Sequence, residues 1–143
     1  MASIRRDIRI NSPAERVWDA LRDVGALHTR LVPGFVTDCR LDGEVRHVTF
    51  ANGIQARELI VDVDAGQRRV AWTAAGGRLT HHNASAQVVE AGDGACRVVW
   101  IADLLPHAMA PAIAAMIEQG LQAMKAAQEA PPTTLAGEPP KGP

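Results

Sequence analysis

Apolar and polar residues alternate along the first ten positions in a way that indicates a strand. Ile4, Ile8 and Ile10 stand at even positions with charged residues between them, and this period of two is typical of a strand with one buried face. Arg6 falls on the same face. Its long side chain either extends to the rim of the sheet, the interpretation we prefer, or places a cation in a cavity.

Two short helices are predicted after this strand. Ser12-Pro13-Ala14-Glu15 has the form of a capping box, in which the serine hydroxyl and the glutamate carboxylate each accept a hydrogen bond from the other residue's amide, and the proline suits the first helical position. A second helix is expected to follow Gly25 and to end at about Leu31, before Val32-Pro33-Gly34 turns the chain.

The central part of the chain, from Phe35 to Asp103, has the pattern of a meander of strands. Its turn signals are Leu41-Asp42-Gly43, Ala51-Asn52-Gly53, Asp64-Ala65-Gly66, Ala75-Gly76-Gly77 and Ala91-Gly92-Asp93-Gly94. Asn52-Gly53 is the clearest of them and predicts a type I′ hairpin. These turns separate six strands, so that with the first strand we expect a sheet of seven, antiparallel because the connections are short.

The last periodic segment predicts one long amphipathic helix. Its stripe recurs at spacings of three and four and consists of Met109, Ile113, Met116, Ile117, Gly120, Leu121 and Met124. Pro106 and Pro111 are tolerated only near the start of a helix, so its regular part should begin between His107 and Pro111 and end near Gln128. A run of strands followed by this helix predicts an α+β fold.

Length and composition limit the chain to one domain, which we assign to residues 1–129 of the 143. Residues 130–143 are rich in proline and small polar residues and are expected to be disordered. The net charge of −1 offers no overall field for nucleic acid. No apolar run has the form of a signal peptide or reaches membrane length, so we expect a cytoplasmic protein without a membrane span.

Residues that commonly carry metal or cofactor chemistry are scattered. Cys39 and Cys96 lack a CxxC partner and are expected to be small buried hydrophobes. His81 and His82 adjoin on one strand, point to opposite faces and therefore cannot chelate one metal. The sequence contains no P-loop or GxGxxG motif. We expect neither a metal nor a cofactor.

The two faces of the strands predict a cavity between the sheet and the C-terminal helix. In residues 81–90 the odd positions are polar, so the even positions, which include Ala84 and Ala86, should face inward, and by the same test Trp72 and Trp100 point inward. Small residues beside two tryptophans suggest a flat apolar cavity for a ring system or acyl chain. The alternative, that both tryptophans belong to a filled core, stays open. The predicted ligand-binding residues are Phe50, Trp72, His82, Ala84, Ala86, Trp100, Met109, Ile113, Met116, Ile117 and Gly120.

Polar candidates for the cavity depend on the register of residues 54–63. If the even positions face inward, Glu58 is a buried carboxylate that could form a general acid/base pair with His82. If the odd positions face inward, Arg57 can clamp a carboxylate or enolate oxygen. A bulge could turn residues of both the even and the odd set inward. The inward charged residue could also do no more than form an ion pair at the rim of the cavity.

The order of these elements resembles the START-like superfamily, also described as polyketide cyclase/dehydrase-like or Bet v 1-like. The likeness covers residues 3–128 and is most specific in Asn11-Ser12-Pro13-Ala14-Glu15-Arg16-Val17-Trp18-Asp19, in Glu58 to Asp64, and in Trp100-Ile101-Ala102-Asp103-Leu104-Leu105-Pro106. It implies a helix-grip fold, in which a curved sheet wraps around the long helix. The superfamily includes carriers, receptors and polyketide cyclases, so the resemblance does not fix a function.

Three functions are compatible with the sequence. The first is a protein that binds a small hydrophobic molecule, aromatic, polyketide-like or lipid-like, in the internal cavity. The second is a polyketide cyclase- or dehydratase-like enzyme that uses His82, Glu58 or Arg57 in the same cavity. The third is a homodimeric interaction module, in which a second copy covers the outward Val99 and Ile101. The chain is accordingly expected to be a monomer or a homodimer.

Overall fold

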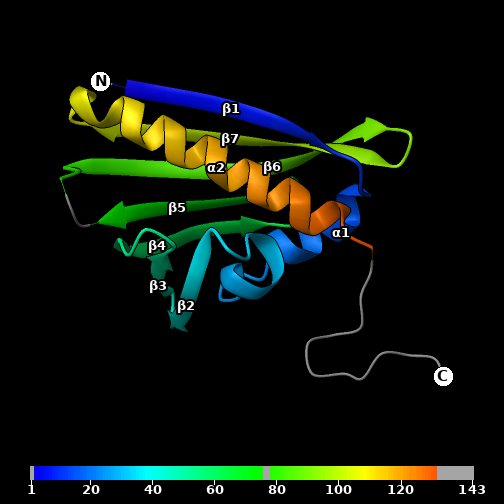
Figure 1. Ribbon diagram of the computed structural model, residues 1–143, viewed down its shortest axis with the longest axis horizontal. Helices are drawn as coiled ribbons and strands as arrows, with labels where there is room; N and C mark the ends of the chain where they lie inside the picture. The colour runs from blue at the N-terminus through cyan, green and yellow to red at the C-terminus, as the bar shows by residue number, and fades with distance from the viewer. Residues whose placement is uncertain (1, 76–77, 132–143) are drawn as a thin grey trace.

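The computed structural model describes residues 2–75 and 78–131, which form one curved antiparallel sheet with a long helix across its concave face (Figure 1). The sheet has seven strands in the order β1-β7-β6-β5-β4-β3-β2. Its strands are β1 (Ala2–Ile10), β2 (Val36–Asp42), β3 (Val45–Phe50), β4 (Gln55–Asp64), β5 (Arg69–Ala75), β6 (His81–Gly92) and β7 (Ala95–Leu105). The predicted α+β class and the seven-stranded antiparallel sheet are confirmed.

A type I′ turn joins β6 to β7. Asp93 and Gly94 both have positive φ, 55° and 72°, and the flanking Gly92 and Ala95 pair directly. This two-residue geometry matches the twist of the strands on either side.

The prediction of the same turn type at Asn52-Gly53 is wrong. Of these two residues only Gly53 has a positive φ, 87°, and its amide donates a hydrogen bond to the Phe50 carbonyl. The Asn52 side chain accepts a hydrogen bond of 3.0 Å from the Ile54 amide. This local bond favours a three-residue loop that ends in a left-handed glycine over the two-residue turn.

The two short helices lie where the sequence predicts them, as α1 (Ala14–Leu21) and η1 (Leu27–Leu31), the latter a turn of π-helix. The predicted capping box does not form, because α1 has no side-chain cap and the Ser12 hydroxyl is buried without a partner. Glu15 forms an ion pair with Arg68 instead. A guanidinium is a stronger partner for a carboxylate than a backbone amide is, which explains the difference.

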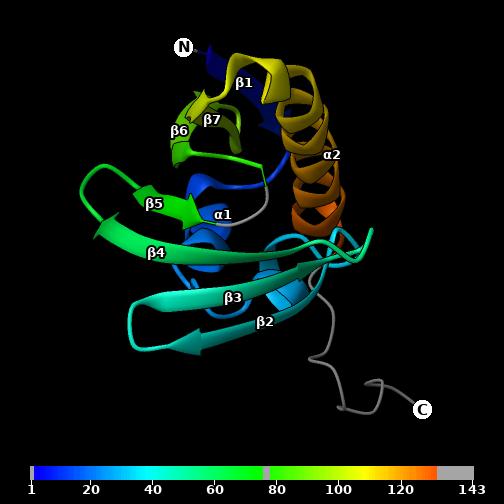
Figure 2. The same ribbon diagram turned by 90° about the vertical axis from the view of Figure 1, so that its left-hand side faces the viewer.

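The long helix α2 (Ala110–Glu129) follows a single 3-10 turn, η2 (His107–Met109), and its predicted limits are confirmed. It packs against β1, β7 and η1, and Figure 2 shows the sheet curving beside it. The C-terminal half of α2 is the buried half, whereas Ile113 and Met116 in its N-terminal half, and Met109 at the end of η2, are only partly buried. Residues 132–143 of the expected disordered tail lie outside the described residues.

The inward faces of the strands are those that the alternation predicts. Ala84, Ala86, Trp72 and the other even positions of β5 to β7 face the helix side. One expected outward residue departs from the pattern, since Ser85 is only 8% exposed. Its short side chain lies between its cross-strand neighbours Ala71 and Ile101, which cover it.

A β-bulge between Ile60 and Asp62 decides the register that the sequence left open in residues 54–63. Before the bulge the even positions face inward, and Glu58 is buried at 8% exposure. Leu59 and Val61 face outward and are 44% and 59% exposed. The bulge thus allows one strand to carry apolar residues on both sides.

At Gly120 the helix lies directly against two aromatic side chains. A Cβ atom at this position would lie 2.9 Å from Cζ3 of Trp100 and 3.2 Å from Cε2 of Phe35. The glycine therefore sets the spacing between α2 and the aromatic residues under it, although glycine in a helix interior costs about 1 kcal/mol relative to alanine.

We predict that Gly120→Ala lowers the free energy of unfolding by about 1 kcal/mol or more, because overpacking of about 1–3 kcal/mol outweighs the gain in helix propensity. Urea denaturation measures the effect, with Gln122→Ala on the exposed side of α2 as the control. In a Trp100→Phe background, which removes the nearest ring atoms, the same substitution should cost less. A fully tolerated Gly120→Ala would contradict the close approach.

Candidate ligand-binding site

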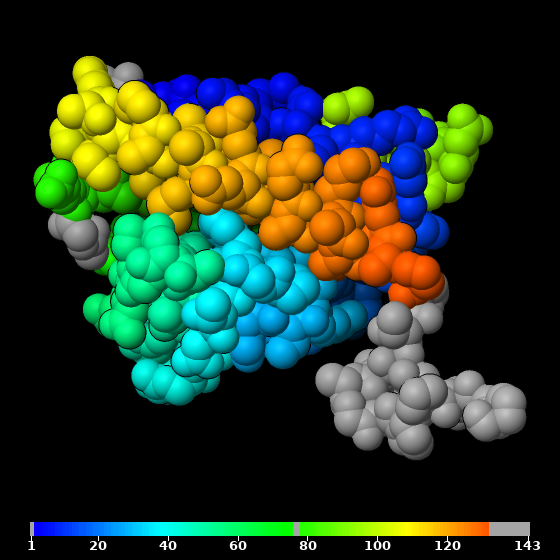
Figure 3. All heavy atoms as spheres, viewed as in Figure 1, coloured from blue at the N-terminus to red at the C-terminus, as the bar shows by residue number. Residues whose placement is uncertain are grey.

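A small cavity lies between the sheet, η1 and the C-terminal half of α2. Its walls come from β2 to β7 and from both short helices, and only two of its lining residues are charged. The lining residues are Leu21, Leu27, Leu31, Val32, Phe35, Val36, Arg46, Phe50, Glu58, Val70, Trp72, Ala86, Trp100 and Met124. In the view of Figure 3, α2 and the segment that contains η1 and the start of β2 meet over this side of the sheet.

Two indole rings occupy most of the interior that the alanines leave open. Trp72 and Trp100 meet edge to face, with their ring centroids 5.9 Å apart. Each pairs with an alanine on β6, Trp72 with Ala84 and Trp100 with Ala86, so that a large side chain lies beside a small one. The interpretation of the tryptophans as filled core therefore holds for most of the concave face.

The space that remains is about 60 Å³. A water molecule takes about 30 Å³ in the liquid, and a pocket for a drug-sized ligand has about 300 Å³ or more. In this conformation the cavity is too small for an organic ligand, which has to displace side chains in order to bind.

A buried ion pair forms the polar wall of the cavity. Arg46 on β3 and Glu58 on β4 are direct cross-strand neighbours, and their side chains are 4% and 10% exposed. The Nε of Arg46 donates to Oε1 of Glu58 at 2.9 Å, and its Nη2 lies 2.6 Å from the same oxygen. Its Nη1 donates to the Val24 carbonyl at 3.2 Å, and its guanidinium lies over the Trp72 ring at 5.4 Å.

Sequence reasoning did not select Arg46, although a signal was present. Arg46, Val48 and Phe50 occupy alternate positions of β3 and share the inward face. A charged residue within an inward apolar set is the pattern that also drew attention to Glu58. Because the two residues lie on adjacent strands in register, each is the partner that makes the burial of the other possible.

His82 lies on the same inward face as this pair but does not contact it. Glu58 pairs with Ala74, and the ladder of β5 and β6 ends at Thr73 and Asn83, the residues next to Ala74 and His82. Two strand spacings put the backbones of Glu58 and His82 about 10 Å apart. Nδ1 of His82 is buried without a hydrogen-bond partner among the described residues. Burial lowers the pKa of His82, and the Glu58 carboxylate opposes this by a smaller amount.

The seam between α2 and Phe35 is the part of the cavity wall with partly exposed aromatic residues. Phe35, Phe50 and Trp100 are all partly buried, and the two phenyl rings meet edge to face at 5.4 Å. Trp100 and Phe35 both lie directly under Gly120. Nε1 of Trp100 is buried with no partner among the described residues. An unpaired buried donor costs about 1–3 kcal/mol, so the closed position of this ring carries a penalty that movement can release.

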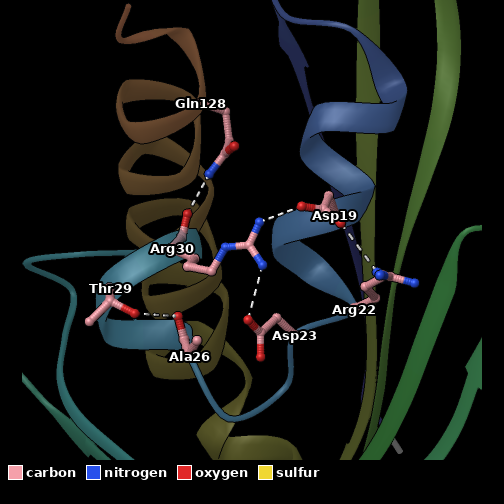
Figure 4. Close-up of polar contacts among 7 residues, drawn as sticks. All are labelled: Asp19, Arg22, Asp23, Ala26, Thr29, Arg30 and Gln128. Atoms are coloured by element: carbon pink, nitrogen blue, oxygen red, sulfur yellow. Dashed lines mark hydrogen bonds and ion pairs between the residues drawn. The ribbon is translucent and has the colours of Figure 1, made fainter. Parts of the chain in front are cut away.

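A polar cluster around Arg30, shown in Figure 4, holds η1, whose Leu27 and Leu31 line the cavity. The Arg30 guanidinium on η1 donates to Asp19 of α1 at 2.5 Å and to Asp23 at 3.0 Å. The hydrogen bond from Arg30 holds the pKa of the Asp19 carboxyl below its usual range. The Arg30 carbonyl accepts a bond of 2.6 Å from the buried Gln128 side chain of α2. Three helices are thereby joined at this end.

The structure brings only some of the predicted ligand-binding residues to the cavity. Phe50, Trp72, Ala86 and Trp100 line it. The predicted residues that do not line it are His82, Ala84, Met109, Ile113, Met116, Ile117 and Gly120. The cavity lies under the C-terminal half of α2, whereas Met109, Ile113, Met116 and Ile117 lie nearer the N-terminus of the helical segment and do not reach it. Gly120 is separated from the cavity by Trp100 and Phe35. Ala84 is packed against Trp72, its cross-strand neighbour.

The structure rules out Arg57 as a clamp inside the cavity, because the register turns its side chain to the outer face. There it lines a shallow groove together with His47. Cys39 and Cys96 are both buried, and burial raises the pKa of each thiol. Among residues 2–75 and 78–131 no three His, Cys, Asp or Glu side chains gather into a possible metal site. In the same residues no helix is long and apolar enough to cross a membrane.

Comparison with known proteins identifies the family. Residues 1–129 match the model of the family described as polyketide cyclase / dehydrase and lipid transport, and the chain belongs to this family. The START-like resemblance drawn from the sequence is confirmed. No curated protein sequence matches the chain.

Solved structures with the same fold have low sequence identity. An uncharacterised protein from Bacillus thuringiensis matches with a TM-score of 0.79 and 19% identity, over 88% of this chain and 98% of that one. Norcoclaurine synthase from Thalictrum flavum matches at 0.67 and 18%, over 90% and 91%. The di-domain ARO/CYC protein BexL matches at 0.76 and 15%, over 89% of this chain and 46% of that one. At these identities the likeness shows the fold alone.

We predict that Glu58→Met destabilises the protein by about 3–5 kcal/mol, because it leaves the Arg46 cation buried without its partner. The double variant Arg46→Met/Glu58→Met should regain most of this loss, since it removes both charges and keeps the volume. Urea denaturation of the wild type, both single variants and the double variant gives the coupling energy. Additive losses in the two single variants would contradict a buried, directly paired arrangement.

We also predict that His82 makes the fold sensitive to acid. Its pKa is lowered in the folded state, so the unfolded chain takes up the proton more readily and stability falls as the pH drops through the unfolded value of about 6.5. His82→Gln should therefore lose less stability than the wild type between pH 7.5 and pH 5.5. Denaturation curves at several pH values test this, with His81→Gln on the outer face as the control. Equal slopes for all three proteins would refute the assignment.

Proposed function

We propose that this protein binds a small apolar molecule, with one or two rings, in the cavity under the C-terminal half of α2. The observation that carries the proposal is the lining of the cavity, which is apolar and aromatic apart from the Arg46–Glu58 pair. Ligand pockets commonly combine such walls with a few oriented polar groups. The family description names both cyclase or dehydrase chemistry and lipid transport, and both require an apolar molecule to be held.

The ligand is proposed to enter at the seam of Phe35, Phe50 and Trp100. The strands around the cavity are joined by backbone ladders, and the cluster around Arg30 ties η1 to α1 and α2. The aromatic residues at the seam are held by packing alone, because Trp100 has no hydrogen-bond partner among the described residues. Rotation of the Trp100 side chain is proposed to make room for a ring of the ligand.

A cyclase- or dehydratase-like reaction in the same cavity is the second candidate. It is favoured by one observation, the unpaired Nδ1 of His82 on the same inward face as Glu58. Proton transfer between them requires a substrate that spans the distance over Ala74. An enzyme of this kind would release water or a cyclised product from a bound polyketone, whereas a carrier would return it unchanged.

We predict that Ala86→Val weakens ligand binding at least tenfold while the fold is kept, because two added methyl groups fill the remaining space and valine suits a strand. A panel of aromatic compounds, isoprenoids and acyl chains is screened by thermal shift and tryptophan fluorescence. At least one class should raise the melting temperature of the wild type, and Ala86→Val should bind it at least tenfold more weakly.

Ala71→Val serves as the matched control, since Ala71 lies on the adjacent strand β5 and faces outward. It should bind as the wild type does. The proposal fails if no class stabilises the wild type, or if Ala86→Val and the wild type bind the ligand equally well.

A further inference from the structure

We infer that the ligand carries one neutral hydroxyl group of the phenol type, which donates a hydrogen bond to Oε2 of Glu58, and that ligands with a carboxylate are excluded. This inference rests on the proposed function, since it names the chemical class of the molecule that the cavity binds.

The first step is the unequal use of the two carboxylate oxygens of Glu58. Nε and Nη2 of Arg46 both contact Oε1, at 2.9 Å and 2.6 Å. No described residue donates a hydrogen bond to Oε2. A carboxylate can accept about four hydrogen bonds, and Glu58 lines the cavity. An acceptor with spare capacity therefore stands on a side chain that is 10% exposed, at the wall of an otherwise apolar space, where a donor on the ligand can bond to it.

The second step is that the positive charge of Arg46 is already paired with Glu58, so that a ligand anion would compete with this carboxylate. Three of its five N–H groups are engaged, those of Nε and Nη2 at Glu58 and one of Nη1 at the Val24 carbonyl, and its charge is already paired with Glu58. The Trp72 ring covers a face of the guanidinium. A ligand carboxylate would lose its hydration and meet the Glu58 carboxylate without an unengaged cation to offset either cost.

The third step concerns the charge of the ligand. Arg46 and Glu58 already neutralise each other, so an ammonium group that approached Oε2 would be repelled by the guanidinium on the same carboxylate. A hydroxyl group brings no charge, costs less to desolvate, and gains a hydrogen bond to a charged acceptor, which is stronger than a bond between neutral groups. The aromatic seam of Phe35, Phe50 and Trp100 favours a ring as the carrier of this group.

The experiment compares three probes of nearly equal size: 4-methylphenol, 1,4-dimethylbenzene and 4-methylbenzoate. Dissociation constants are measured by NMR titration of the tryptophan indole N–H signals of the full chain, with the signal of Trp18 in α1 as an internal control because Trp18 does not line the cavity. The titrations are repeated on Arg46→Met/Glu58→Met. Should this variant not fold, Arg46→Leu/Glu58→Leu, with shorter side chains, replaces it.

In the wild type, 4-methylphenol should bind more tightly than 4-methylbenzoate. The preference for 4-methylphenol over 1,4-dimethylbenzene should be at least about tenfold greater in the wild type than in the charge-free variant, because only the wild type offers the charged acceptor. Taking the ratio between the two proteins cancels the intrinsic difference in hydrophobicity between the probes.

The inference is overturned if this ratio is the same in both proteins, or if 4-methylbenzoate is the tightest ligand of the wild type. In either case binding in the cavity still stands, and only the chemical class is wrong. If none of the three probes binds, the single-ring phenol class is also overturned, whereas the proposed function fails only when the wider panel of apolar compounds gives no binding either.

Discussion

A curved sheet of seven strands presents more concave surface than one helix can cover. In this protein large side chains fill the part of the concave face that the helix leaves uncovered. α2 covers β1 and β7 and contacts η1, while Trp72 and Trp100 fill the middle of the sheet over Ala84 and Ala86. Gly120 lets the helix settle on Trp100 and Phe35. The interior is densely packed, as protein interiors are, and the partly buried side chains of Phe35, Phe50 and Trp100 form part of the cavity wall in place of continuous backbone.

The Arg46–Glu58 pair gives the remaining space its chemical character. Burying two charges is expensive, and replacing such a pair with apolar residues is often neutral or stabilising. The pair here contacts Trp72 and the Val24 carbonyl, which recovers part of that cost, yet one carboxylate oxygen receives no bond from the described residues. A polar group with unused capacity at the edge of an apolar cavity is more simply explained by ligand recognition than by stability.

The sequence predicted the fold better than the site, for reasons that particular residues make plain. The alternation of apolar and polar residues around Ile4, Trp72 and Trp100 depends only on which face of each strand is buried. The structure confirms the inward faces that this alternation predicts. The predicted turn at Asn52 was wrong because the Asn52 side chain bonds to the Ile54 amide. The predicted cap at Ser12 was wrong because Glu15 pairs with Arg68, which is distant in the sequence. The contact of Arg46 with Glu58 joins residues on two strands, β3 and β4, and periodicity within one strand does not show which residues of two strands face each other. The volume left around the tryptophans follows from their rotamers, which the sequence does not contain.

The central claim is that the cavity opens locally at Trp100 while the rest of the fold stays intact. Native-state hydrogen exchange of the Trp100 indole N–H across a series of low urea concentrations tests this most directly. The account predicts an opening free energy well below that of global unfolding and nearly independent of urea, since little surface is exposed when one ring turns. Exchange that occurs only with the free energy and urea dependence of global unfolding would contradict it, because the wall at Trp100 would then be as fixed as the core.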